Sequence, residues 1–246
     1  TRPVYSISIS ARATLDMHSL NNEGGEGNQI QTRMVNIVDQ DGRLQNVNAI
    51  SGDMFKHIQA EHLFRILSEA DGVPLCAGCR QFNANRINAD TGFIAQTAND
   101  SDADILDKLL QTCAMDDIEG ILITEGKRSV PRKSVVEFGW VVGVPGAVET
   151  DSYFHVKYAA ERSAEQRAQD REAQTTGANL GQAIFHRPAS SGVYAAVCHL
   201  ELARIGFNDI TQTYAIDADQ RRQRMAALLQ SVLFTFMQPN GAMRSA

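Results

Sequence analysis

The sequence predicts an α+β fold in which strands and helices alternate along the chain. Residues 51–70 and 218–237 carry apolar side chains at helical spacing, whereas residues 4–15 alternate with the period of two that is typical of an amphipathic strand. The composition, 43% hydrophobic and 21% charged, is that of an ordinary globular protein and excludes a disordered chain, a collagen and a coiled coil. A length of 246 residues suits one large domain or two small ones. We expect a single domain with insertions.

The first insertion is expected at residues 16–50, directly after the N-terminal strand. Residues 21–29 are rich in glycine and asparagine, which predicts a loop. Asp41-Gly42 then separates two apolar runs, residues 34–38 and 44–50. An Asp-Gly pair in this position is a strong signal for a β-hairpin.

The helix after this hairpin has clear start and stop signals. Ser51 or Asp53 can cap its N-terminus, and Gly72 and Pro74 end it. Residues 72–117 form a second insertion, in which we expect loops and one short helix near residues 105–113.

Three apolar runs in the second half of the chain predict buried strands at residues 118–124, 134–144 and 192–205, the second ending at Pro145. Residues 158–182 are polar and have no apolar face, so we expect a solvated helix and loop there. With the final helix, the order is βαββαβ without its last strand, which is the ferredoxin-like order with insertions.

Charge and cysteine content restrict the partners and the compartment. The net charge is −6, whereas a sequence-blind DNA-coating protein is expected to be basic, although a local basic stripe suffices for nucleic acid. Four cysteines do not make a disulfide scaffold, which indicates a reducing, cytoplasmic location. Neither a secretory signal nor a long apolar run is visible in the sequence, so we expect no membrane partner.

The sequence lacks the short motifs of common enzymes. It contains no phosphate-binding P-loop, no GxSxG nucleophile turn and no HExxH zinc motif. His57, Glu61 and His62 are similar to an inverted zinc-protease pattern, but one residue too many separates the first two. They are expected to lie on the outer face of an ordinary helix.

Three cysteines suggest a metal site that is incomplete. Cys76 and Cys79 have zinc-knuckle spacing, and Cys113 and Asp116 repeat it with a carboxylate in the last place. Structural zinc sites normally use only cysteine and histidine, and this part of the chain has the least regular pattern. We therefore expect no tightly bound zinc and no other cofactor.

The start of the first helix is the best candidate for a phosphate-binding site. Helix N-termini present unpaired N–H groups and the positive end of the helix dipole. Cations in the first turn oppose that dipole unless an anion is bound. The candidates are Ser51, Asp53, Lys56 and His57. The alternative is a capped helix with two solvated side chains.

Two further groups are candidates for RNA contacts. One is a basic cluster between two predicted strands, whose alternative is a solvated hairpin turn: Lys127, Arg128, Arg132 and Lys133. The other surrounds the glycine-rich loop and offers amides and cations suited to phosphate and sugar, the alternative being an ordinary polar loop: Arg12, Asn21, Asn22, Gln31 and Arg33. The aromatic pattern of an RNA-recognition sheet is absent.

Several long motifs together resemble one known family. They are SISARATLDMHSLNNEGGEGNQIQTR, NAISGDMFKHIQAEHL, RKSVVEFGWVVGVP, VETDSYFHVKYAAER, IFHRPASSGVYA and RIGFND. They are similar, over nearly the whole chain, to the DevR-type CRISPR-associated autoregulator family. That family supplies the repeated, crRNA-binding backbone subunit of type I Cascade, the guide-RNA surveillance complex.

The resemblance implies a modified RRM palm, a ferredoxin-like domain with inserted fingers and a thumb. It places the finger at residues 72–117 and the thumb at about residues 158–181, and it adds Lys157 and Arg187 to the RNA-binding residues. The expected partners are the guide crRNA, the target DNA strand paired to it, further copies of this chain in a filament, and other Cascade subunits. The palm's last strand is expected beyond residue 246.

The function expected from this resemblance is a non-enzymatic RNA-binding scaffold, in which base pairing selects the target. Two alternatives stay open. A DevR-like transcriptional or developmental regulator would need a DNA-reading element, and no helix-turn-helix signature is visible. A guide-dependent RNA-cleaving subunit would use Asp16, Asp53 or His57 near the scissile phosphate.

Overall fold

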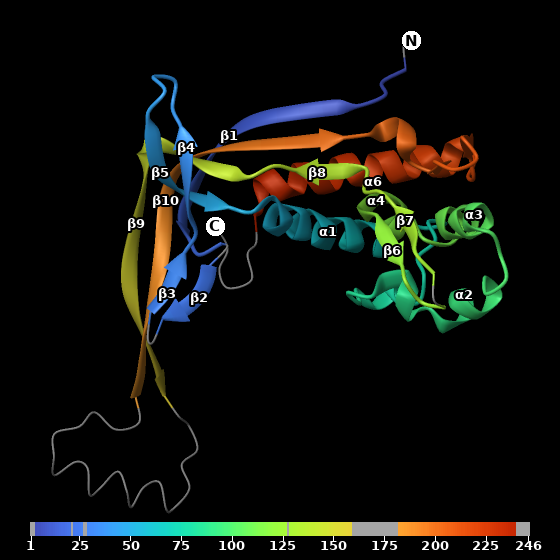
Figure 1. The fold of residues 1–246 in the computed structure, drawn as a ribbon, viewed down its shortest axis with the longest axis horizontal. Coiled ribbons are helices and arrows are strands. Elements are labelled where there is room, and N and C mark those ends of the chain that lie inside the picture. Colours follow the sequence, from blue (N-terminus) through green and yellow to red (C-terminus); the bar gives the residue numbers. More distant parts are fainter. Residues whose placement is uncertain (1–2, 21, 27–28, 127, 159–181, 240–246) are drawn as a thin grey trace, which may run out of the picture.

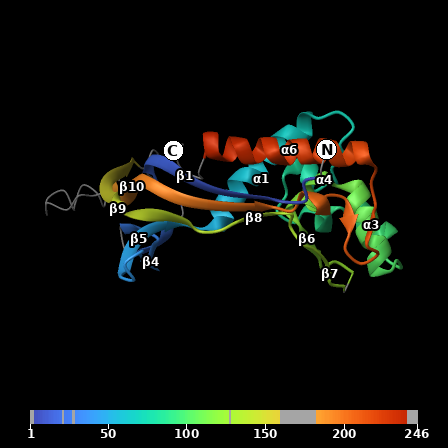
Figure 2. The same ribbon diagram turned by 90° about the horizontal axis from the view of Figure 1, so that it is seen from above.

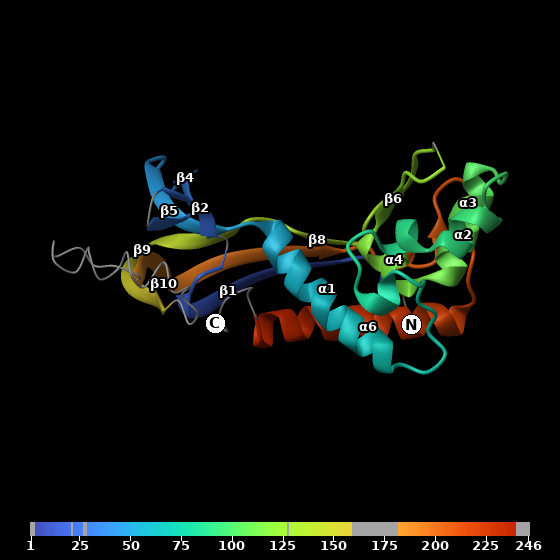
Figure 3. The same ribbon diagram turned by 90° about the horizontal axis from the view of Figure 1, so that it is seen from below.

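The computed structural model describes residues 3–20, 22–26, 29–126, 128–158 and 182–239. It confirms a mixed α+β fold and is elongated (Figure 1). A long β-ribbon lies at one end and a small helical insertion at the other, with two long helices between them (Figures 1 and 3).

The central strand of the sheet is β10 (Gln182–Leu200). It pairs antiparallel with β1 (Ile7–His18) along one edge, and with β9 (Val141–Tyr158) and β8 (Val136–Phe138) along the other. Ala195 illustrates this position, because it faces Arg12 of β1 and Val142 of β9. The predicted N-terminal strand is therefore confirmed and shifted by three residues.

The second and third predicted apolar strands have different limits in the structure. The run at 134–144 is split into β8 and β9, and β9 continues past Pro145 to Tyr158. The register with β10 shifts between Gly192 and Tyr194, opposite Pro145. A proline, which has no N–H to donate, is tolerated at such a bulge, so the predicted end at Pro145 is wrong. The run at 192–205 overlaps β10, which begins earlier than predicted, at Gln182, and ends earlier, at Leu200.

The first insertion contains more strands than predicted. The expected loop at 21–29 includes β2 (Asn22–Glu26) and the start of β3 (Gln29–Thr32), which pair with each other. The predicted hairpin is confirmed as β4 (Met34–Val38) and β5 (Leu44–Ile50). Its turn has Gly42 at a φ of 77°, where glycine avoids steric strain.

Helices α1 (Gly52–Glu69) and α6 (Ala218–Met237) match the two predicted helices and cover one face of β1, β8 and β10 (Figure 2). Side chains from both layers meet in the core between them, including Leu15, Phe55, Ile58, Val141 and Tyr194. The apolar stripe of each helix therefore packs on the sheet.

The second insertion is more helical than predicted. It contains two short 3₁₀ helices, η1 (Cys79–Gln81) and η2 (Arg86–Ala89), followed by α2 (Thr91–Gln96), α3 (Asp102–Thr112) and α4 (Ala114–Glu119). The expected strand at 118–124 shrinks to β6 (Ile121–Ile123), which pairs with β7 (Val130–Arg132), because α4 includes its first two residues.

The remaining short elements are η3 (Leu202–Arg204) and a two-stranded ribbon of β11 (Phe207–Asn208) and β12 (Thr213–Tyr214). Among the described helices, none combines the length and the apolar composition that a membrane crossing requires.

Candidate nucleic-acid interface

The start of α1 is fixed against the sheet by a cap and a close backbone contact. Ser51 is the N-cap, and its Oγ accepts a hydrogen bond from the Met54 amide at 3.2 Å. A side chain at Gly52 would lie 2.2 Å from the Phe138 carbonyl oxygen, so only glycine lets the helix approach the end of β8. Asp53 and His57 are exposed in the first two turns.

Lys56 points into a partly buried site rather than into open solvent. Its Nζ donates to the Glu119 carbonyl oxygen at 3.2 Å, and burial lowers its pKa. Burial raises the pKa of the Glu119 carboxyl to about 7, while the charges of Lys56 and Arg86 oppose that shift. A phosphate contact would therefore require the Lys56 ammonium to share or exchange its present bond.

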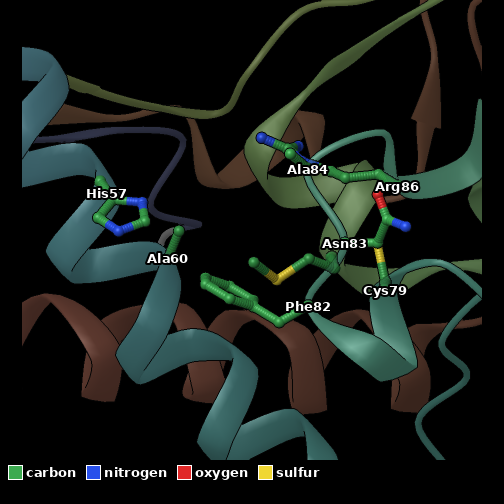
Figure 4. Close-up of a pocket in the computed structure, with 8 residues that line it drawn as sticks. His57, Ala60, Cys79, Phe82, Asn83, Ala84 and Arg86 are labelled. Atoms are coloured by element: carbon green, nitrogen blue, oxygen red, sulfur yellow. The ribbon is translucent and has the colours of Figure 1, made fainter. Parts of the chain in front are cut away.

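A pocket of about 240 Å³ opens beside these groups. His57 and Ala60 of α1 form one wall, and residues of the loop between η1 and η2 form the other (Figure 4). The His57 and Phe82 rings lie 6.1 Å apart across it. The lining residues are His57, Ala60, Cys79, Phe82, Asn83, Ala84, Arg86 and Met115. The lining of this pocket therefore combines apolar side chains, such as Phe82 and Met115, with the guanidinium of Arg86.

Arg33 lies at the same end of α1 as the cap. Its carbonyl accepts a hydrogen bond from the Ala49 amide at 3.0 Å, just before the helix, and its guanidinium lies 5.2 Å from the ring centre of Trp140. Trp140 follows Gly139, whose carbonyl oxygen would lie 2.9 Å from a side chain at Gly52. The structure thus gathers Arg33, Trp140 and the α1 start.

Other predicted contacts lie on the sheet. Arg12 is exposed on β1, on the same side as Ser10 and Thr14, and Gln31 is exposed on β3. Arg187 is half-buried on β10, opposite Tyr153 of β9. Asn22 and Lys157 are described only by their backbones, in β2 and β9, and Asn21 lies outside the described residues.

The basic cluster between β6 and β8 is not one positive patch, which corrects the expectation. Arg132 is only 3% exposed and binds Asp117 and Asp209 at 2.7 and 3.1 Å. Arg128 donates to the carbonyl oxygens of Thr97 and Ala98, both at 2.9 Å. These two carboxylates balance the buried charge of Arg132. Its guanidinium is therefore not available to RNA in this structure.

Lys133 is exposed and pairs with Glu137 at 3.3 Å, and Lys127 lies outside the described residues. The β6–β7 turn that contains Arg128 lies at the end of the molecule opposite the β4–β5 hairpin (Figure 3). The predicted site residues therefore do not form one cluster.

Sequence reasoning missed Trp140, Glu119 and Arg86. Trp140 is the single tryptophan of the chain, which is a signal that the sequence offered, whereas its 46% exposure is visible only in the structure. Glu119 and Arg86 had no such signal, because only folding brings them beside Lys56.

Comparison with known proteins connects this arrangement to a family. Residues 9–246 match the family described as CRISPR-associated negative auto-regulator DevR/Csa2. The chain belongs to the DevR/Csa2 family. This membership confirms the predicted resemblance to the DevR-type CRISPR-associated autoregulator family.

Two curated relatives of this chain have names related to that family. CRISPR-associated protein Cas7/Cst2/DevR of Methanocaldococcus jannaschii is 25% identical over 238 residues, which cover 92% of this chain and 72% of the relative. CRISPR-associated protein Cas7/Csa2 1 of Saccharolobus solfataricus is 22% identical over 245 residues, which cover 94% of this chain and 71% of the relative.

This chain is also similar to two solved structures. A chain of a "CRISPR RNA-guided surveillance complex, pre-nicking" is 14% identical with a TM-score of 0.48, covering 93% of this chain and 71% of its own. The chain in the crystal structure of Thermofilum pendens Csc2 is 11% identical, with a TM-score of 0.38. The match covers 93% of this chain and 60% of the Csc2 chain. Because these TM-scores are below 0.5, family membership rests on the sequence comparison.

Proposed function

We propose that this chain is the crRNA-binding backbone subunit of a type I CRISPR surveillance complex, and that it polymerises along the guide RNA and presents it to target DNA. The observation that carries this proposal is the family match over residues 9–246. Base pairing between the guide RNA and the DNA selects the target, whereas the protein recognises the backbone and the shape of the RNA.

The palm of this subunit is an RRM-like domain. The arrangement of the strands supports this assignment, since β10 lies between β1 and the β8–β9 edge, while α1 and α6 cover the same face. In a ferredoxin-like order the first strand pairs with the third and the third with the second, which is the pairing of β1, β10 and β9.

Three insertions complete the domain: residues 16–50 as a hairpin, 72–117 as a finger and about 158–181 as a thumb. Most of the thumb lies outside the described residues. Its flanking strands are nevertheless paired, with Tyr158 opposite Gln182. The thumb is the segment that reaches the neighbouring copy.

The guide RNA runs past the α1 start and the exposed face of β1. Arg33 and Trp140 offer a cation and an exposed ring beside the Ser51 cap, and Arg12 adds a second exposed cation. A phosphate at this place would be attracted by the positive end of the α1 dipole and by the arginine charge. The contact to RNA is structural, and cleavage is left to another subunit.

The decisive experiment is to isolate the nucleic acid that co-purifies with the tagged chain, coexpressed with a CRISPR array and its partner subunits. We expect RNA of one length whose sequence contains a spacer. Double-stranded DNA from one promoter would instead support a regulator. Regularly spaced cuts in a complementary RNA, lost in His57→Ala, would support the RNA-cleaving alternative.

A single substitution tests the RNA path. Arg12→Ala removes one exposed cation, so we expect weaker RNA binding and a salt dependence flatter by about 0.7 log units per log salt, as for one lost phosphate contact. Lys108→Ala is the matched control, since Lys108 is an exposed cation on α3 that pairs with Asp100. Equal salt slopes for both variants would contradict this path.

A further inference from the structure

The second insertion contains a buried group of four metal-ligand side chains. We name Cys76, Cys79, Cys113 and Asp116 the thiol cluster. One ligand atom from each lies within 4.8 Å of all the others, and all four residues are buried. Cys76 and Cys79 precede and open η1, whereas Cys113 and Asp116 belong to the start of α4. Two segments almost 40 residues apart thus converge on one point.

The distances within the thiol cluster are close to those of a tetrahedral site. The Sγ atoms of Cys76 and Cys79 lie 3.4 and 3.5 Å from Oδ2 of Asp116. Zinc–sulfur bonds of about 2.3 Å give sulfur–sulfur edges of about 3.8 Å in a tetrahedron. All four ligand atoms lie within 4.8 Å of one another, so no separation needs to close by more than about 1 Å around an ion.

Asp116 carries an independent sign of a missing ligand. Its Oδ1 is buried and has no hydrogen-bond partner. The nearest cation, Nη1 of Arg86, is 4.0 Å away, too far for a hydrogen bond, and instead donates to the Gly120 carbonyl oxygen at 2.6 Å. A buried carboxylate oxygen without a partner is costly, and a metal ion would satisfy it.

Backbone groups are arranged to support thiolates. The Cys79 amide donates to the Cys76 sulfur at 3.3 Å, and the Asp116 amide donates to the Cys113 sulfur at 3.5 Å. Such second contacts orient metal ligands and stabilise their negative charge. Three thiolates, one carboxylate and Zn²⁺ leave a net charge of about −2, which the guanidinium of Arg86 partly balances.

We propose that the thiol cluster binds one structural Zn²⁺ through three thiolates and the Asp116 carboxylate. Thiolates favour zinc over harder ions, and four protein ligands leave no open position for catalysis. The ion would hold the segment of η1 and η2 against α4, and thereby keep Phe82 and Arg86 beside the pocket next to α1.

This proposal revises the expectation of no tight zinc for a structural reason. The cysteines do not lie in irregular chain, because helices surround them, and the one atypical ligand is held in contact with two of the thiols. A disulfide between Cys76 and Cys79 would use two sulfurs and leave Cys113 and the unpaired Asp116 oxygen as they are. All four cysteines of the chain are free in the structure.

The test measures metal in the full chain, produced in medium supplemented with ZnCl₂ and dialysed against a weak chelator. We expect about one zinc per chain by elemental analysis. Cys76→Ser and Asp116→Ala should lose it, whereas Cys198→Ser should keep it. Cys198 is the matched control, because it is a buried free cysteine on β10 outside the thiol cluster.

A second measurement does not depend on whether the variants fold. Adding Co²⁺ to the wild-type chain stripped of metal should produce a thiolate-to-cobalt charge-transfer absorption with tetrahedral ligand-field bands, which Zn²⁺ then abolishes. A folded wild-type chain that contains no zinc and gives no such absorption would overturn the proposal. Iron in place of zinc, a Cys76–Cys79 disulfide, or zinc retained in Cys76→Ser/Cys113→Ser would overturn it as well.

Discussion

At the scale of single residues, the molecule keeps two arginines inside by placing one carboxylate between them. Asp117 binds Arg132 through Oδ1 and Arg224 through Oδ2, both at 2.7 Å, and all three side chains are fully buried. The Gly206 amide adds a further bond to the same carboxylate. This network joins α4, β7, α6 and the turn after η3, so its contribution is to position these elements.

We expect Asp117→Ala to lower the free energy of unfolding by about 3–5 kcal/mol, because it removes the carboxylate that pairs with the buried Arg224 and leaves Arg132 with only Asp209 as a carboxylate partner. Urea unfolding of the full chain measures this. Asp100→Ala serves as the control, since Asp100 pairs with the half-exposed Lys108, and the loss there should stay below about 1 kcal/mol. Similar losses for the two variants would mean that the Asp117 network contributes no more than a surface pair.

Glu119 should make stability depend on pH. Burial raises its folded pKa from 4.5 to about 7, against the charges of Lys56 and Arg86, and it also faces the Cys198 thiol. The folded state therefore holds this proton more tightly than the unfolded chain does. The resulting stability is present in full below pH 4.5 and is lost as the pH rises through 7.

We expect Glu119→Gln to match the wild type near pH 5 and to be more stable than it near pH 8, by up to about 3 kcal/mol. Thermal unfolding at the two pH values measures the difference. Glu137→Gln is the control, because the same substitution is made there at an exposed carboxylate on β8. A wild-type advantage at pH 8 would contradict the raised pKa.

At the scale of elements, the α1 start depends on one capping bond. Ser51→Ala removes the acceptor of the Met54 amide, and we expect a loss of about 1 kcal/mol in unfolding free energy. Ser68→Ala near the end of α1 is the control. Its Oγ donates only to the Phe64 carbonyl oxygen, which α1 already uses, so alanine there should be neutral or slightly favourable. A neutral Ser51→Ala would show that the cap is not needed.

The elements also differ in how far local pattern determines them. The β4–β5 hairpin follows from Asp41-Gly42, and α1 and α6 follow from their caps and apolar stripes. By contrast, β2 and the first residue of β3 belong to the glycine- and asparagine-rich stretch 21–29, which predicts a loop. The pairing of β2 with β3, and of β3 with β10, makes them strands. Long-range hydrogen bonds override weak local preference in a sheet.

At the scale of the whole molecule, the ends of the β9–β10 ribbon allow a clean deletion. Tyr158 lies opposite Gln182, so replacing residues 161–179 with a short glycine–serine turn should close the ribbon without strain. We expect this variant to stay folded and to bind RNA, but to form no ordered filament on guide RNA in electron micrographs. Full-length filaments would refute the thumb assignment.

Local sequence determined the family, the alternation of strands and helices, and the elements with strong caps and turns. Tertiary structure decided the rest: Arg132 is an internal charge partner, β9 passes Pro145 at a bulge, and four ligands from two segments form the thiol cluster. The physical reason is the distance along the chain over which each kind of interaction acts. Periodicity and capping act over a few residues, whereas burial, register and ligand geometry depend on groups that only the folded chain brings together.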